Sequence, residues 1–71
     1  MNKYAIVIEK AEQNFSAYVP DVPGCIATGK TVEETRQLLM DALASHLELL
    51  REAGEPVPQP STLADYVEVV S

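Results

Sequence analysis

The stretch YVPDVPGCIATGKT, residues 18–31, concentrates two prolines, two glycines and the single cysteine of the chain. Proline cannot donate a hydrogen bond to a sheet, so Pro20 and Pro23 should end the strand that precedes them. Gly24 allows a backbone conformation that is closed to other residues, and the second glycine marks another turn. The stretch therefore predicts a short strand over residues 25–28, held between two turns.

Two further strands are expected upstream of this stretch. Residues 3–9 alternate with apolar side chains on both faces, a pattern that is typical of a central strand. Residues 15–19 alternate as well, and the polar residues 11–14 connect the two segments. A short polar connection between two alternating segments predicts an antiparallel hairpin.

Downstream, the sequence TVEE begins a long helix, which is expected over residues 32–53. In this capping box the Thr31 hydroxyl accepts a hydrogen bond from the Glu34 amide, and the Glu34 side chain reaches back. One face of the helix is apolar and the opposite face is charged, so the helix should lie on a flat apolar surface. Gly54 fits as its C-terminal cap, and Pro56 stops its continuation.

The remainder of the chain predicts a connector and a last strand. Proline occupies every second position of the connector, residues 55–61, which should therefore be extended. Residues 66–70 alternate again, and a strand after the helix should lie parallel to residues 3–9 through a right-handed crossover. The expected fold is α+β in the order β-β-β-α-β, a mixed four-stranded sheet with one long helix on one face.

One helix covers only one face of such a sheet, and exposed apolar faces usually mark an interface. A chain of 71 residues forms one small domain of marginal stability, which favours stabilisation by a partner subunit. We therefore expect self-association to a homodimer or a larger assembly.

The net charge is −6, with 11 acidic side chains against 5 basic ones. This surface would repel a phosphate backbone, so direct binding of nucleic acid is not expected. It favours encounter with a basic partner, although the same charge would also keep a small protein in solution. The N-terminal sequence lacks the features of a signal peptide or membrane span, and the cysteine has no disulfide partner in the chain, so a cytoplasmic location is expected.

Taken together, these segments resemble the HicB-like antitoxin family over essentially the whole chain. The residues that carry the resemblance form three groups in order: Pro20, Asp21, Pro23, Gly24 and Cys25; Gly29 and Thr31; Gly54, Pro56, Pro58, Pro60 and Ser61. The resemblance implies a partial ribonuclease H-like fold without the nuclease chemistry. It also implies a partner, a small basic HicA-type toxin that cleaves mRNA and whose active site the antitoxin covers. Family members usually add a C-terminal operator-binding domain, and no DNA-binding domain is expected in residues 1–71.

Two alternatives would make the protein an enzyme. Cys25 lies in a turn where a nucleophile could be exposed, but such a thiol needs a base close by, and His46 lies among leucines of the expected helix. Cysteine is also among the most buried residue types, so we favour a packed Cys25. Two-metal nuclease chemistry needs several converging carboxylates, and Glu9 and Asp65 alone do not form such a cluster. The sequence thus predicts no catalytic residue, no metal site and no cofactor.

The function that we expect is that of an antitoxin-like binding module. Five acidic residues are candidates for contacts with a basic toxin: Glu9, Glu12, Asp21, Glu34 and Asp41. Two alternatives stay open, a stand-alone structural or regulatory oligomer without a toxin partner and a metal-dependent nuclease.

Overall fold

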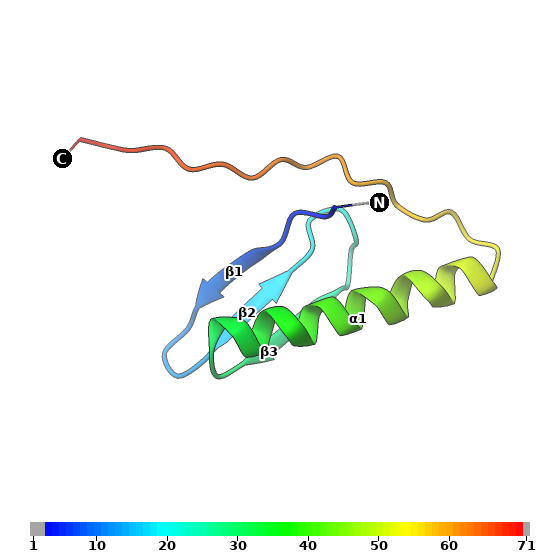
Figure 1. The fold of residues 1–71 in the computed structure, drawn as a ribbon, viewed down its shortest axis with the longest axis horizontal. Helices are drawn as coiled ribbons and strands as arrows, with labels where there is room; N and C mark the ends of the chain where they lie inside the picture. The colour runs from blue at the N-terminus through cyan, green and yellow to red at the C-terminus, as the bar shows by residue number, and fades with distance from the viewer. Residues whose placement is uncertain (1–2, 71) are drawn as a thin grey trace.

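The computed structural model describes residues 3–70, which form three strands and one helix (Figure 1). The elements are, in chain order, β1 (Val7–Lys10), β2 (Phe15–Tyr18), β3 (Ile26–Gly29) and α1 (Val32–Glu52). The strands form an antiparallel sheet in the order β1-β2-β3, and α1 crosses one of its faces. The α+β class and the succession of three strands and one long helix are confirmed.

The register of the sheet separates a covered face from an open one. Ile8, Ala17 and Ala27 lie opposite one another across the three strands, and all three pack in or against the core under α1. The adjacent row consists of Val7, Tyr18 and Ile26. Because side chains alternate between the faces of a sheet, this row points away from the helix. The exposed fractions of this row agree with that direction, since Tyr18 is 40% exposed and Ile26 is 70% exposed.

The proline-rich turn between β2 and β3 packs as part of the core. The Val22 amide donates to the Val19 carbonyl at 3.1 Å, and the Cys25 amide donates to the Val22 carbonyl at 3.2 Å. Gly24 has a φ of 83°, the left-handed conformation that favours glycine. Val19, Val22 and Cys25 are each at most 4% exposed. The turn therefore folds inward and supports the sheet.

The start of α1 is fixed by its cap and by a close approach to β3. Thr31 is the N-cap, and its hydroxyl accepts from the Glu34 amide at 3.0 Å. The Glu34 carboxylate accepts from the Lys30 amide at 2.6 Å, one residue earlier than the expected capping box. A Cβ on Gly29 would lie 2.7 Å from Thr35 Oγ1, so the strand and helix meet where only glycine fits without displacement. These contacts determine how closely α1 packs on the sheet.

The helix lies over β3 and β2 and touches β1 least. Its buried residues are Thr35, Leu39 and Leu47, and Leu39 is only 1% exposed. On the β1 side, by contrast, Met40 is 56% exposed. The flank of α1 above β1 is therefore only partly covered.

Two expected strand starts and the expected position of β1 in the sheet are corrected by this structure. The ladder of β1 begins at Val7 rather than at residue 3, because Val19 directs its amide to the Cys25 carbonyl on the β3 side, and Pro20 after it has no amide hydrogen to donate toward β1. The same turn uses the Cys25 amide and carbonyl, so β3 starts one residue later than expected. In addition, β1 is an edge strand, although its apolar pattern indicated a central one.

The expected fourth strand, residues 66–70, is not formed in the single chain. Residues 63–70, which we name the arm, are extended but pair with no strand, and their large apolar side chains are 79–100% exposed. Figure 1 shows the arm leaving the connector and running past β1. No ladder joins the arm to another strand among the described residues, although the outer edge of β1 is free. The mixed four-stranded sheet is thus wrong for the isolated chain.

Candidate partner-binding surface

The side chains considered for catalysis do not form an active site in the described structure. Cys25 is 4% exposed, and burial raises the pKa of its thiol above the ordinary value. A raised pKa disfavours the thiolate, which is the nucleophilic form. His46 is half-buried on α1. Within residues 3–70, no group of three or more histidine, cysteine or acidic side chains could hold a metal ion.

Asp21 fixes the end of the connector to the turn between β2 and β3. Its carboxylate accepts four hydrogen bonds, from the amide and hydroxyl of Ser61 at 2.9 and 3.1 Å and from those of Thr62 at 2.9 and 2.7 Å. These bonds, those from Thr62 foremost, lower the pKa of Asp21 to about 2. Hydrogen bonds to the charged form stabilise a carboxylate in this way. Both oxygens of Asp21 are therefore occupied within the chain.

The other four acidic candidates are distributed over two elements and a turn. Glu34 is engaged in the helix cap described above, and Asp41, exposed on α1, accepts from the side-chain amide of Gln37 at 3.1 Å. Glu9 is exposed in β1, opposite Ser16, and Glu12 is exposed in the following turn. Only Glu9 and Glu12 lie on one hairpin, and the five carboxylates do not form one cluster.

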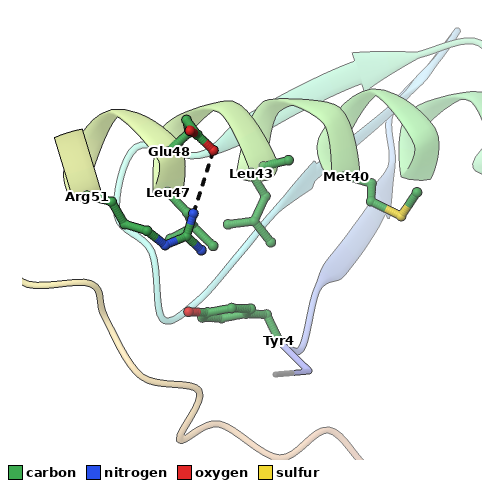
Figure 2. Close-up of a pocket in the computed structure, with 7 residues that line it drawn as sticks. Tyr4, Met40, Leu43, Leu47, Glu48 and Arg51 are labelled. Atoms are coloured by element: carbon green, nitrogen blue, oxygen red, sulfur yellow. Dashed lines mark ion pairs between the residues drawn. The ribbon is translucent and has the colours of Figure 1, made fainter. Parts of the chain in front are cut away.

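An apolar groove, which sequence reasoning missed, lies between the start of the chain and the β1 flank of α1 (Figure 2). It has a volume of about 400 Å³, and the aromatic ring of Tyr4 lies across from Leu43 and Leu47. An ion pair between Glu48 and Arg51, 3.7 Å apart, borders it. A neighbouring hollow of about 300 Å³ shares Tyr4, Met40 and Leu43 with it and adds Ile6, Arg36 and Leu39. We name these two hollows together the β1-side groove.

Tyr4 is positioned by the connector as well as by the sheet. Its hydroxyl donates to the carbonyl of Pro58 at 2.6 Å, while its ring packs against the core. The same-face spacing of Tyr4, Ile6 and Ile8 was visible in the sequence. It could not reveal a groove, because a groove depends on how far α1 extends over β1.

A third hollow, of about 440 Å³, separates β1 from the base of the arm. It is lined on one side by residues 5–8 and on the other by residues 62–66, with Pro20 between them. The outer edge of β1 faces this hollow and carries no neighbouring strand. Together with the β1-side groove, it makes the β1 side the least covered part of the molecule.

The structure thus defines a small α+β domain with a buried thiol, dispersed carboxylates and open apolar surfaces. Comparison with known families is specific: a family model described as HicB-like antitoxin of bacterial toxin–antitoxin systems matches residues 4–70. The chain belongs to this HicB-like antitoxin family. Residues 3–70 hold no helix of the length and hydrophobicity needed to cross a membrane.

Individual relatives agree with the family. The chain is 32% identical to Antitoxin HicB 1 of Photorhabdus laumondii over 94% of its own length and 44% of the relative. It is 34% identical to an uncharacterised 14.9 kDa protein of Haemophilus phage HP1 over 90% of this chain and 48% of that protein. It is 33% identical to a UPF0150 protein of Thermoplasma acidophilum over 80% of this chain and 84% of the relative. The chain thus spans about half the length of the first two relatives.

Proposed function

We propose that this domain neutralises a small basic HicA-type toxin that cleaves mRNA, by binding over the active site of the toxin. The observation that carries the proposal is membership of the HicB-like antitoxin family over residues 4–70. Two relatives from Photorhabdus laumondii bear the name antitoxin HicB, and each matches 94% of this chain. The domain acts by occlusion and needs no catalytic residue of its own.

The negative net charge of this chain supports a basic partner. A net charge of −6 on 71 residues creates a negative field that accelerates encounter with a positively charged protein. Glu9, Glu12 and Asp41 are exposed and free to contact such a partner. Asp21 and Glu34 contribute differently, since their carboxylates hold the connector and the helix cap in place.

A partial ribonuclease H-like fold is part of the same proposal. Three antiparallel strands followed by a helix correspond to the first part of a ribonuclease H-like unit, which the family resemblance implies. In this proposal the domain acts in the cytoplasm, where mRNA is cleaved, and binds protein rather than nucleic acid.

A second candidate function is self-association without a toxin. It is supported by the open sheet face, where Tyr18 and Ile26 are exposed, and by the exposed arm. Apolar surface of this extent is usually covered by another protein.

The proposed function is tested by co-expression of this chain with a small basic HicA-type toxin, sought first in the neighbouring open reading frame. The expected result is co-purification, rescue of growth, and weaker binding at high salt, because the attraction is partly electrostatic. A triple variant, Glu9→Gln, Glu12→Gln and Asp41→Asn, should bind more slowly. A control with the same loss of charge elsewhere, Glu52→Gln, Glu55→Gln and Glu68→Gln, should bind faster than the first variant. Absence of both binding and rescue by the unmodified chain would contradict the proposal.

A further inference from the structure

The arm is the most exposed apolar segment of the described chain. Five of its eight residues are large and apolar, and each is 79–100% exposed: Leu63, Tyr66, Val67, Val69 and Val70. In an extended backbone Val67 and Val69 share one face, and Tyr66, Glu68 and Val70 share the other, a spacing typical of a strand with an apolar face. An exposed segment with this pattern lacks both a ladder partner and a surface on which to bury its apolar face.

The base of the arm is attached to the turn between β2 and β3, and the arm runs from there past β1 and beyond the fold. Three prolines keep the connector extended, and Asp21 fixes Ser61 and Thr62 with four hydrogen bonds. The radius of gyration of 13.8 Å exceeds the value of about 11 Å expected for a compact chain of this length. Figure 1 shows the arm continuing in an extended line beyond the fold.

The surface that such a strand would fit lies on the β1 side. The outer edge of β1 is free, and a strand added there would lie beneath the uncovered flank of α1. The β1-side groove next to it is lined by apolar side chains such as Ile6, Met40 and Leu43. An added strand with valines on one face would bring apolar groups to this groove, and its backbone would complete the unpaired edge.

In the single chain the arm does not use this surface. A hollow of about 440 Å³ lies between residues 5–8 and residues 62–66, so the base of the arm is held apart from β1. The four bonds to Asp21 fix Ser61 and Thr62, so the base of the arm stays on the side of this hollow opposite β1. A second copy could receive the arm as it projects, with its base still attached to Asp21.

We propose that two copies of this chain exchange their arms reciprocally, each arm adding a strand to the outer edge of β1 of the other copy. The arrangement is two-fold and closed, because each copy provides one arm and one edge. Part of the charge pattern agrees, since the arm contains Asp65 and Glu68 and no basic residue, while Lys3 precedes β1 and Lys10 ends it, although β1 also contains Glu9. This inference rests on the self-association proposed above and identifies the segment responsible for it.

The experiment measures the mass of the full-length chain by light scattering over a range of concentration. The expected mass is twice 7.7 kDa. The arm variant Val67→Asp with Val69→Asp leaves the core untouched and should raise the dissociation constant of the dimer roughly 100-fold. Leu49→Asp introduces the same type of change at a 64% exposed site on α1 and should leave the mass unchanged.

A mixed dimer of isotope-labelled and unlabelled chains tests the exchange directly. The expected result is a set of intermolecular NOEs between the methyl groups of Val67 or Val69 and those of Ile6 or Ile8. A monomeric mass for the unmodified chain would overturn both self-association and the exchange. A dimer that survives the arm variant, or NOEs from the arm only within one chain, would overturn the exchange and leave self-association standing.

Discussion

Asp21 and Thr62 are 41 residues apart in the sequence and are joined by two hydrogen bonds, at 2.7 Å between their side chains and 2.9 Å to the Thr62 amide. Ser61 adds two more bonds to the same carboxylate. The turn that identifies the family is therefore also the attachment point of the connector. Asp21, which the sequence indicated as a candidate partner contact, thus also fixes the base of the arm.

This attachment should be insensitive to pH over a wide range. The pKa of Asp21 is lowered from 3.8 to about 2, so the folded state favours the carboxylate. The stabilisation it gives is fully present above pH 3.8 and is lost as the pH falls through about 2. An NMR titration of the Thr62 amide should have its midpoint near 2.

The variant Asp21→Asn removes the titrating carboxylate. It should abolish the titration of the Thr62 amide and increase hydrogen exchange at the Ser61 and Thr62 amides. Asp41→Asn should change neither, since Asp41 bonds only to Gln37 among the residues described. A midpoint near 3.8 in the unmodified chain would mean that the four hydrogen bonds are not formed in solution.

The core should depend strongly on Leu39, which is 1% exposed beneath α1. Leu39→Ala removes buried methyl groups and leaves a cavity, at a cost of about 2–5 kcal/mol in the free energy of unfolding. That is a large part of the stability of so small a domain. Leu49→Ala makes the same chemical change at a 64% exposed site and should alter stability by less than about 0.5 kcal/mol. Denaturant unfolding compares the two variants, and equal effects would show that α1 packs through another face.

The contact between β3 and α1 should not tolerate a side chain at residue 29. The Cβ of Gly29→Ala would lie 2.7 Å from Thr35 Oγ1 and 3.0 Å from the Thr35 amide nitrogen. Because the second atom belongs to the backbone, the helix start has to shift, at a cost of about 1–3 kcal/mol. Thr28→Ala, at the exposed neighbouring position, serves as the control. Thermal unfolding should show a clear decrease only for Gly29→Ala, and an unchanged midpoint would contradict the close approach.

Cys25 should be unreactive while the domain is folded. Its thiol is 4% exposed, and burial raises its pKa, so both access and thiolate formation are limited. A thiol-alkylating reagent should modify it slowly in native buffer and rapidly in denaturant, as followed by mass spectrometry. Equal rates in the two conditions would indicate a native reactive thiol and would revive the catalytic alternative.

The local features of this fold could be predicted from the sequence because they depend on neighbouring residues. The cap at Thr31, the left-handed turn at Gly24 and the packing of Cys25 follow from residue types that each satisfy a backbone or burial requirement nearby. The hairpin and the long helix follow from hydrophobic periodicity in the same way.

The remaining features depend on partners that are distant in the sequence. The apolar pattern of β1 is the same for a central strand and for an edge strand whose apolar faces border grooves, so it could not place β1 in the sheet. The alternation of residues 66–70 predicts a strand but not its neighbour, which the single chain does not supply. Likewise, the groove beside Tyr4 exists because α1 lies over β3 and β2, and local sequence does not encode that offset.

The most direct test of the proposed function measures RNA cleavage by a purified small basic HicA-type toxin, with increasing amounts of the domain added. We predict that cleavage falls to background once the domain equals the toxin in molar amount, and that RNA does not compete once the complex has formed. Cleavage that continues undiminished in the presence of excess folded domain would contradict the account.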